Sequence, residues 1–388
     1  MSVLFVHDHI FYTKNGKVYS DKFYYNVLRR YIDIFSKVTF LARSVEVEDT
    51  KNFALASGNG VEFVFVKSIS SIKSYFGHRQ QQEKLIRNLI KEHDKIIVRL
   101  PSEYGLLTAK VAYQMDVTHA VEVVGCAWDA MWNYGGIKSK IYAPFFFLKM
   151  RKIVKQSKYI LYVTSQFLQT RYPSSPYAIT TNVSNVELPD LENHILEKRL
   201  KKISSNNDKI VFGTIGSLKT RYKGVHIAIQ ALSTLSGKFN NFEYHILGAG
   251  NSKNYFELAK NIGIDDKIFF EGVLPSGKPI FDWLNTVDIY LQPSLQEGLP
   301  RALIEAMSRA CPAIGSTAGG IPELLNEEMI FDIKKSEDFP MIIEKLLQNK
   351  LLMEKEAKAN FKTAISYQKN SLDTKRKEFW LNFQKSTN

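Results

Sequence analysis

Residues 292–323 read QPSLQEGLPRALIEAMSRACPAIGSTAGGIPE, and the apolar segment DIYL runs directly into them. We interpret DIYL as a strand and RALIEAM as a helix, because the latter residues are strong helix formers. Pro300 is expected to open that helix, since its missing N–H would have no partner in the first turn. The amides of Gly298 and Leu299 then lie at the positive end of the helix dipole. The stretch therefore predicts a strand, a turn and a helix that together bind an anion such as a phosphate.

Two carboxylates bracket this anion site. Glu297 lies in the turn before the helix, and Glu305 follows inside it. At about 100° per residue, Glu305 falls roughly one turn beyond the helix start and can reach what the amides hold. Ionised carboxylates accept hydrogen bonds from hydroxyls, so the pattern suggests a ligand with a phosphate and a polyol, such as a sugar nucleotide. The alternative, that Glu297 only complements the helix dipole and Glu305 only faces solvent, stays open on these residues alone.

The motif closely resembles the donor-binding motif of glycosyltransferase family 4, whose members are retaining enzymes of the two-domain GT-B fold. In that family a glutamate, seven residues and a second glutamate frame the sugar nucleotide, and the GSTAGGIPELL that follows here is also similar. The resemblance implies that Glu297 holds hydroxyls of the donor sugar and Glu305 those of the ribose. It assigns the Gly298 and Leu299 amides to the sugar or the distal phosphate. Ala310 departs from the family's helix-ending glycine; alanine in a left-handed cap costs roughly 1 kcal/mol, so we expect the helix to end differently without changing the site.

Charge and length limit the partners of the chain. Its 388 residues suffice for two domains with cores of their own, and 52 Lys plus Arg against 39 Asp plus Glu give a formal charge of +13. This excess favours an anionic partner such as nucleic acid, acidic lipid headgroups or a diphosphate substrate. Because no helix-turn-helix, RNP-type or zinc-finger pattern is recognised, no nucleic-acid partner is expected.

Cysteine usage and hydropathy bear on the compartment. The sequence has two cysteines far apart, Cys126 and Cys311, which we expect to be unpaired thiols in a reducing compartment. No apolar run of eighteen residues and no secretory segment is recognised. A cytoplasmic location is therefore expected, with peripheral attachment to the inner face of the plasma membrane left open.

The order of apolar segments predicts the fold class. An apolar strand at 2–6, helical spacing over 23–34 and the strand VTFLAR form a β-loop-α-β start, which is typical of a parallel sheet with crossover helices. With the family resemblance, this predicts an α/β GT-B fold of two Rossmann-like domains facing each other across a cleft. The expected parts are an acceptor-side domain at 1–197, a linker at 198–209 (KRLKKISSNNDK), a nucleotide-sugar domain at 210–370 and a C-terminal helix at 371–388 that crosses back to the first domain.

Two loops of the first half are candidates for ligand contact, because ligands bind beyond the carboxyl ends of parallel strands. The first is 7–19, where Gly16 would let the backbone approach a phosphate; the alternative is that Asn15 and Gly16 only form a hairpin turn. The second is GCAWDAMWNYGG, where family 4 often has a histidine that is missing here. Asp129 in this loop is our candidate catalytic polar group, although a helix-capping role fits it as well.

Residues 138–158, KSKIYAPFFFLKMRKIVKQSK, carry seven basic residues and no acidic one. Pro144 is expected to start a helix here. Phe146, Met150 and Ile153 would share one side of that helix, while lysines gather on another. A basic amphipathic helix with aromatics is typical of an interfacial membrane helix, and a crossover helix packed on the sheet explains the pattern equally well. Both interpretations are kept, and they can coexist.

The segment IVFGTIGSLKTRYKG at 210–224 begins the second half with a strand and a glycine-bearing loop. Lys223 resembles the family's phosphate-binding lysine. An ammonium supplies to a diphosphate leaving group the positive charge that a divalent metal supplies elsewhere. The family commonly has an arginine where this chain has Ser217. Either Lys219 or Arg221 compensates, or the phosphate has one fixed charge fewer; a solvated surface lysine is the alternative for Lys223 itself.

Two further loops complete the resemblance. FEYHILGAGN ends a strand in a loop that contains Gly250, and KIFFEGVLP contains Val273. A GxG pair alone is weak, but the order of strands and loops follows family 4 throughout 209–326. By resemblance, Gly250 belongs to the donor site and the loop around Val273 holds the base.

These features predict a retaining, metal-independent hexosyltransferase with no cofactor. It would transfer a sugar from a nucleotide-diphosphate donor, with uridine as the expected base, to a lipid-linked or growing glycan acceptor. The segment YVTSQFLQTRYP and the GCAWDAMWNYGG loop resemble a bacterial subset associated with surface polysaccharides, including capsule. Two alternatives stay open: a GT-B sugar-nucleotide epimerase or phosphorylase, and a non-catalytic sugar-nucleotide-binding subunit.

Overall fold

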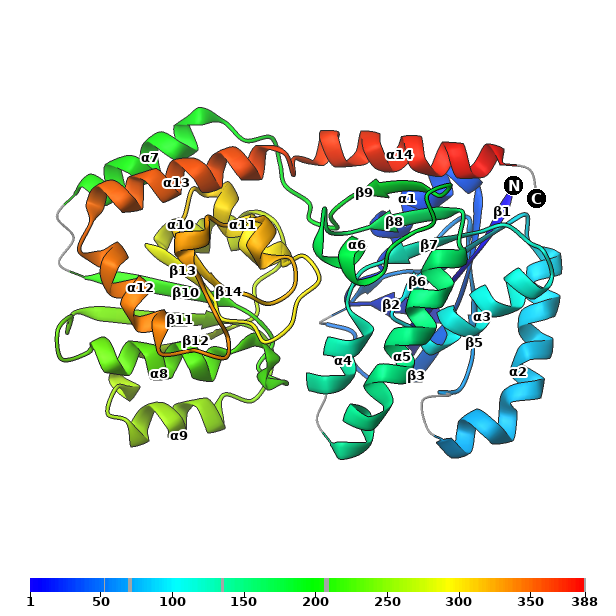
Figure 1. Cartoon of the computed structure of the whole chain (residues 1–388), viewed down its shortest axis with the longest axis horizontal. Helices are drawn as coiled ribbons and strands as arrows, with labels where there is room; N and C mark the ends of the chain where they lie inside the picture. Colours follow the sequence, from blue (N-terminus) through cyan, green and yellow to red (C-terminus); the bar gives the residue numbers. More distant parts are fainter. Residues whose placement is uncertain (52, 69–71, 134–135, 206–208, 387–388) are drawn as a thin grey trace. The chain divides into compact units, whose positions relative to one another are not determined.

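The computed structural model describes the chain except for residues 52, 69–71, 134–135, 206–208 and 387–388. The chain divides into two compact units (Figure 1), Met1–Val183 with Asp373–Asn388, and Ser184–Leu372. Each unit is built around one sheet whose central strands run parallel, with helices packed against it. The predicted α/β class with parallel sheets is therefore confirmed.

The sheet of the first unit runs β5-β3-β1-β6-β7-β8-β9 with all pairs parallel. Its strands are β1 (Ser2–Lys14), β2 (Lys17–Ser20), β3 (Lys37–Glu46), β4 (Ala54–Leu55), β5 (Val61–Phe65), β6 (Lys95–Leu100), β7 (His119–Val123), β8 (Tyr159–Tyr162) and β9 (Ile179–Asn182). The central strands are continuous apolar runs because helices cover both faces of a parallel sheet.

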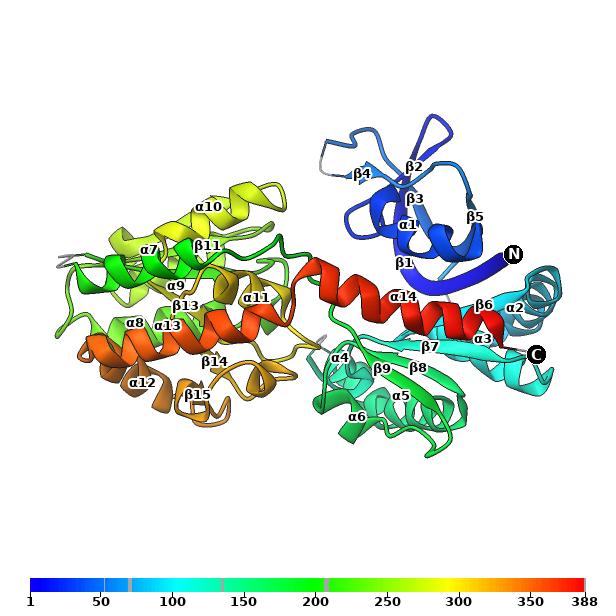
Figure 2. The same cartoon turned by 90° about the horizontal axis from the view of Figure 1, so that it is seen from above.

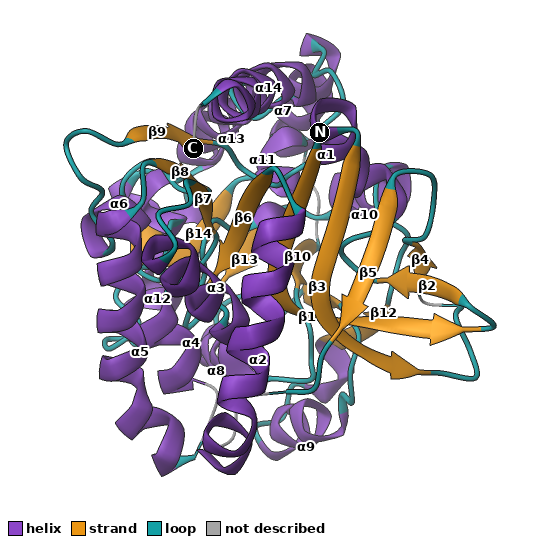
Figure 3. Cartoon of the chain, turned by 90° about the vertical axis from the view of Figure 1, so that its right-hand side faces the viewer, coloured by secondary structure: helices purple, strands orange, loops and turns teal. Residues whose placement is uncertain are grey.

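The first strand is much longer than the sequence predicts. We expect a strand at 2–6 and a loop at 7–19, but β1 continues to Lys14 beyond a register shift between Val6 and Ile10. It then pairs antiparallel with β2. Asn15 and Gly16 form the two-residue turn with φ of +50° and +72°, the positive values that such a hairpin needs. Figure 3 shows β2 and β4 at the opposite end of the sheet from β9.

The helices of the first unit include one from the far end of the chain. They are α1 (Tyr25–Phe35), α2 (Ile72–Glu92), α3 (Glu103–Gln114), α4 (Ala127–Asn133), α5 (Ile137–Gln156), α6 (Phe167–Arg171) and most of α14 (Lys369–Lys385). Trp380 of α14 is fully buried, and its ring lies 5.8 Å from that of Tyr31 and 6.4 Å from that of Phe35. Aromatic contacts of this kind tie α14 into the core of the unit.

The sheet of the second unit runs β12-β11-β10-β13-β14-β15, again parallel. Its strands are β10 (Ile210–Ile215), β11 (Phe242–Leu247), β12 (Ile268–Gly272), β13 (Ile289–Gln292), β14 (Ala313–Ser316) and β15 (Ile330–Phe331). Its helices are α7 (Asn193–Ser204), η1 (Arg221–Lys223), α8 (Val225–Leu235), α9 (Lys253–Asn261), η2 (Asp265–Lys267), α10 (Lys278–Thr286), α11 (Arg301–Ser308), η3 (Ile321–Glu323), η4 (Glu327–Met329), α12 (Asp338–Leu347) and α13 (Lys350–Ile365).

Helix α7 occupies much of the segment for which the sequence predicts a linker. The polar composition of 198–209 predicts a domain linker, yet residues up to Ser204 belong to a helix, and 206–208 lie outside the described residues. Figure 2 shows α7 alongside α13, and the two helices pack together. The chain leaves the first unit earlier, at Val183.

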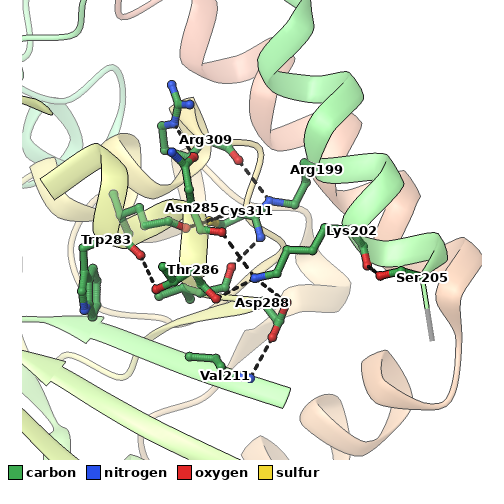
Figure 4. A network of polar contacts seen from close by, with 12 residues as sticks. Arg199, Lys202, Ser205, Val211, Trp283, Asn285, Thr286, Asp288, Arg309 and Cys311 are labelled. Atoms are coloured by element: carbon green, nitrogen blue, oxygen red, sulfur yellow. Dashed lines mark hydrogen bonds and ion pairs between the residues drawn. The ribbon is translucent and has the colours of Figure 1, made fainter. Parts of the chain in front are cut away.

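Basic side chains of α7 contact other residues of the second unit (Figure 4). These contacts explain why a helix forms where the sequence predicts a linker. Arg199 is only 3% exposed and donates to the carbonyl of Val287 at 2.5 Å and to Cys311 Sγ at 2.9 Å. Lys202 Nζ lies 2.7 Å from Asp288 Oδ1. Basic residues that read as solvated in the sequence thus fasten α7 to its neighbours, because a buried cation needs such partners.

Candidate functional site

Loops of the second unit meet at the carboxyl edge of its sheet. They follow β10, β11, β13 and β14, which run parallel and so end at the same edge. Three backbone hydrogen bonds join them: Leu218 N to Ala249 O at 2.8 Å, Leu295 N to Tyr222 O at 2.7 Å and Gly320 N to Gly298 O at 2.7 Å. The loop after β10, which carries Lys223, and the motif with Glu297 and Glu305 are therefore neighbours in the fold.

Two glycines allow the loops to approach so closely. Gly224 has φ +71°, and a Cβ there would lie 1.7 Å from Pro293 O. Gly319 has φ +60°, and a Cβ there would lie 2.2 Å from the carbonyl oxygen of Glu297. Only glycine fits positions that combine a left-handed backbone with such contact. These two glycines therefore allow the segments that contain Lys223 and Glu297 to lie next to each other.

Lys223 and Glu297 are in direct contact. Lys223 Nζ lies 2.6 Å from Glu297 Oε1, and the two side chains are only 19% and 10% exposed. Glu297 Oε1 also accepts hydrogen bonds from Ser294 Oγ at 2.8 Å and from Gln292 Nε2 at 3.1 Å. All three contacts use Oε1, so none of them engages Oε2. The residues predicted to hold the phosphate and the sugar are thus brought together, with one carboxylate oxygen left out of these contacts.

Helix α11 starts beside this pair. Its first residue is Arg301, and Pro300 is the N-cap instead of the first helical residue, one position from the prediction. No side chain caps this end. The amides of Gly298 and Leu299 precede it in the turn, where an anion is favoured by the helix dipole.

Glu305 lies inside α11 in a half-buried position. Burial raises the pKa of its carboxyl from the usual 4.5 to about 7, and the charge of Arg301 opposes this shift. At neutral pH the side chain is therefore close to the midpoint of its titration. Hydroxyl donors from a ligand would favour the ionised form, because hydrogen bonds to a charged acceptor are the stronger ones.

The end of α11 differs from the expectation. The sequence predicts that the helix ends differently from the family's pattern, because Ala310 replaces a glycine. The structure instead has Ala310 in the left-handed conformation, with φ +52° and no exposed surface. The alanine accepts the strain, roughly 1–2 kcal/mol for a non-glycine residue. This end is remote in sequence from Glu297 and leaves the turn before α11 unaffected.

The other predicted donor residues lie in the loops at the same edge of the sheet. Ser217 Oγ donates to the Ala249 carbonyl at 3.3 Å and thereby braces the loop after β10. Gly250, with φ +135°, packs against that loop. Arg221 is exposed on η1, and Val273, which follows β12, is 65% exposed. All four remain candidates for contact with a ligand.

Two polar atoms near this site lack a hydrogen-bond partner among the described residues. They are His226 Nδ1, in the first turn of α8, and Gln296 Oε1, next to Glu297. Burial, with the charge of Arg221, lowers the pKa of His226 to about 4, so its ring is neutral at physiological pH. Because most buried polar atoms in folded proteins are satisfied, such atoms mark places where a ligand or water completes the site.

The first unit contains two predicted site residues, Asp129 and Gly16, and both have structural roles within that unit. Asp129 lies in the first turn of α4 and contacts Arg171 Nη1 at 3.2 Å; Arg171 also donates to Cys126 Sγ at 3.1 Å. Burial raises the pKa of Asp129, and the Arg171 charge opposes this. Gly16 sits at the tip of the β1–β2 hairpin, as the alternative interpretation has it. Residues 134–135 of the loop that contains Asp129 lie outside the described residues.

The sequence interpretation missed His7 and Asp8. The Asp8 carboxylate accepts hydrogen bonds from the amides of Glu103 at 2.5 Å and Tyr104 at 3.3 Å, at the start of α3. Burial raises the pKa of Asp8, whereas burial and the Arg99 charge lower that of His7. The polar HDH directly after the apolar VLFV was the available signal. The prediction of a loop at 7–19 does not separate this HDH segment from the rest of the loop.

Helix α5 carries two apolar sides. Phe146, Met150 and Ile153 are buried, as predicted for a helix packed on the sheet, although α5 starts at Ile137 and Pro144 lies inside it. On another side lies a stripe of exposed apolar residues, which we call the α5 stripe. It consists of Ile137, Ile141, Phe145 and Leu148, which are 77%, 63%, 59% and 60% exposed.

Neither a membrane-spanning helix nor a metal cluster is found among the described residues. No helix there is both long and apolar enough to cross a bilayer. Within the same part of the chain, no group of three or more His, Cys, Asp or Glu side chains is arranged to hold a metal ion.

Comparison with known proteins agrees with this geometry. Residues 197–364 match the family model described as glycosyl transferases group 1. The chain is 31% identical over 390 residues to Protein CapJ of Staphylococcus aureus, covering 100% of this chain and 97% of that protein. It is also 34% identical over 113 residues to the putative colanic acid biosynthesis glycosyltransferase WcaL of Salmonella typhimurium, 27% of this chain and 28% of that one.

Solved structures show the same fold. The Anabaena protein HepE, crystallised with UDP and glucose, matches with a TM-score of 0.66 at 13% identity, covering 99% of each chain. The GT-B glycosyltransferase fold expected from the motifs is confirmed by this match over nearly the whole chain.

Proposed function

Because the chain belongs to the glycosyl transferases group 1 family, we propose that it is a retaining hexosyltransferase of surface polysaccharide synthesis. Its donor is a UDP-sugar, and its acceptor is a lipid-linked or growing glycan. The contact of Lys223 with Glu297 beside the start of α11 carries this proposal. The UDP and glucose bound to HepE support the donor, and the name of WcaL, a putative colanic acid biosynthesis glycosyltransferase, supports a role in polysaccharide synthesis.

Positive charge for the leaving group comes from Lys223 and from the Gly298 and Leu299 amides. The ammonium has three N–H donors, and the contact with Glu297 at 2.6 Å leaves others for a phosphate oxygen. Charge placed in advance at a departing diphosphate lowers the barrier without reorganisation. Lys223 thereby performs the neutralisation for which other transferases use a divalent metal.

Glu297 positions the donor sugar. Since its known contacts all use Oε1, Oε2 accepts a hydrogen bond from a sugar hydroxyl in our proposal. We assign no protein nucleophile or general base. The bond between the anomeric carbon and the diphosphate oxygen breaks, and the acceptor oxygen bonds to that carbon on the same face. Because the acceptor attacks the face that the diphosphate leaves, configuration is retained, and the departing phosphate oxygen takes the acceptor proton.

The remaining donor contacts follow from the loops. Glu305 accepts hydrogen bonds from the ribose hydroxyls, and the segment at Val273 holds the base. Arg221, exposed on η1, supplies the second positive charge that Ser217 does not. We retain Asp129 as a candidate polar group on the acceptor side. Gly16 is retained only as a candidate donor contact at the hairpin tip.

We also propose that residues 138–158 attach the protein to an anionic membrane surface at the cytoplasmic side. The α5 stripe supports this, because four exposed apolar side chains recur along one side of the helix. Basic residues flank the stripe, among them Lys138, Lys140 and Arg151. An apolar stripe between cations is typical of helices that lie in the bilayer interface, where each cation contributes about 1 kcal/mol.

The release of UDP tests the proposed site. With membrane lipid extract as acceptor, Lys223→Ala and Glu297→Ala should each lower turnover at least about tenfold, which corresponds to a barrier about 1.4 kcal/mol higher. The exposed pair Lys253 and Glu257, 4.0 Å apart on α9, offers matched controls in Lys253→Ala and Glu257→Ala. Unchanged turnover in both site variants would refute the assignment. A change of the sugar without release of UDP would indicate an epimerase.

Flotation with vesicles tests the membrane proposal. The wild type should float with phosphatidylglycerol vesicles at low salt and much less at high salt, because screening weakens the cationic contribution. Ile141→Ser with Phe145→Ser should abolish flotation, since burial of each apolar side chain contributes about 1.5–3 kcal/mol to binding. The buried-side variant Met150→Leu is the control. Absence of any bound wild type at low salt would remove the proposal.

A further inference from the structure

A groove lies between α3 and α5 in the first unit, and none of the residues assigned above to the donor lines it. It has a volume of about 620 Å³, within the range of roughly 300–1,000 Å³ typical of small-molecule sites. Each helix contributes one row of side chains at helical spacing. The row from α3 includes Leu106, Leu107 and Lys110, and that from α5 includes Lys149, Lys152 and Ile153.

The lining divides into an apolar floor and a cationic rim. Leu106, Leu107 and Ile153 are buried and form the floor. Lys110, Lys149 and Lys152 are exposed at the rim, where they face a single carboxylate, Glu103. That acid is already engaged, because it accepts a hydrogen bond from Tyr142 OH at 2.8 Å, and Tyr142 in turn accepts one from Lys149 Nζ at 3.0 Å. The rim therefore keeps an excess of positive charge.

We propose that this groove binds one anionic phospholipid. An acyl chain lies on the floor, and the phosphate contacts the rim lysines. The charge selects an anionic headgroup, since a neutral apolar ligand offers no opposite charge to Lys110 and Lys152 at the rim. The position selects a bilayer lipid, because Lys152 lies one helical turn beyond Leu148, the last member of the α5 stripe. The groove thus continues the surface that we propose to face the membrane.

This inference deepens the proposed membrane attachment and rests on it for the source of the lipid. Its test uses a lipid that forms no bilayer. The full-length protein is titrated with dihexanoyl phosphatidylglycerol below its micelle concentration, with dihexanoyl phosphatidylcholine and inorganic phosphate as separate probes. Binding is followed by the thermal midpoint, which rises when a ligand binds only the folded state. The anionic lipid is expected to bind at least tenfold more tightly than either other probe.

Variants separate the groove from the stripe. Lys110→Glu with Lys152→Glu should weaken lipid binding by at least about tenfold, from two reversed charges. Both lysines are exposed, so the fold should persist, and an unchanged midpoint of urea unfolding without ligand verifies it. Phe145→Ser should keep the binding of monomeric lipid while losing vesicle flotation.

Four outcomes would overturn the assignment. These are equal binding of phosphatidylcholine, equal binding of phosphate alone, full binding by the lysine variant, and loss of monomeric lipid binding in Phe145→Ser. Binding of a short polyprenyl phosphate with no binding of phosphatidylglycerol would also overturn it, in favour of an acceptor site. Failure of sugar transfer leaves all these readouts intact, so the two proposals fail separately.

Discussion

Replacing Gly224 by alanine should disrupt the donor site more than any other single methyl group added in its loops. Gly224 has φ +71°, where an L-residue is strained by roughly 1–2 kcal/mol. The new Cβ would also stand 1.7 Å from Pro293 O, a backbone atom that no rotamer change can move. Overpacking of this kind typically adds about 1–3 kcal/mol. We therefore expect a loss of about 2–5 kcal/mol in the free energy of unfolding of the second unit.

The functional effect should follow from the same displacement. The residue before Gly224 is Lys223, and the loop that must yield carries Glu297. A shift that relieves the overlap separates these two side chains from their 2.6 Å contact. We expect Gly224→Ala to weaken binding of UDP-sugar even where the protein remains folded, because fixed geometry is what the site supplies.

The matched control is Gly237→Ala. Gly237 lies in the same unit, just after α8, and a Cβ there meets no atom within 4 Å. At a site without strain, alanine should leave stability unchanged or raise it by about 0.4–1 kcal/mol. Urea unfolding of both variants and calorimetric titration with UDP measure the two effects. Equal stability of the two variants, with donor affinity retained in Gly224→Ala, would refute the reasoning.

Two further predictions concern side chains described above. The pKa of Glu305 near 7 lies above the unfolded value of 4.5, so the contribution of this residue to stability is lost as the pH rises from 4.5 through 7. Hydroxyls of the donor favour the ionised carboxylate, so UDP should bind more tightly above pH 7. Glu305→Gln should flatten the pH dependence of both stability and UDP affinity. An unaltered pH dependence in this variant would contradict the assignment to Glu305. Arg199→Ala should lower the free energy of unfolding by at least about 1–3 kcal/mol because buried carbonyl acceptors lose their donor. Lys201→Ala, exposed on the same helix, should change it by less than about 0.5 kcal/mol; similar losses in urea would show that burial is not the cause.

The second unit is well predicted from the sequence because its signals are local. Pro300, the glycine loops and the order of strands each specify a turn or a helix start, and parallel strands bring their carboxyl ends to one edge. The contact between Lys223 and Glu297 could be inferred in this way, although 74 positions separate them. What the sequence does not carry is which oxygen of Glu297 is engaged, since that depends on Ser294 and Gln292.

Two of the errors, at α7 and at the start of β1, have a common physical origin. Arg199 and Lys202 look like solvated charges until the carbonyls and the carboxylate that pair with them are known. The HDH segment in β1 looks like a loop because polar residues in a strand are unusual without buried partners, and Asp8 finds these in the amides of α3. These two errors therefore concern polar groups satisfied by residues far away in sequence.

The assembly of the first unit from two separate segments has a consequence for synthesis. Its core is incomplete until Trp380 and the rest of α14 emerge from the ribosome, whereas the second unit is one continuous segment, Ser184–Leu372. At ordinary translation speeds the first segment waits roughly 10–40 s for its missing helix. During that interval the rings of Tyr31 and Phe35 lack their partner. The half of the protein made first is thus the half that finishes folding last, and it is the one exposed to chaperones and proteases meanwhile.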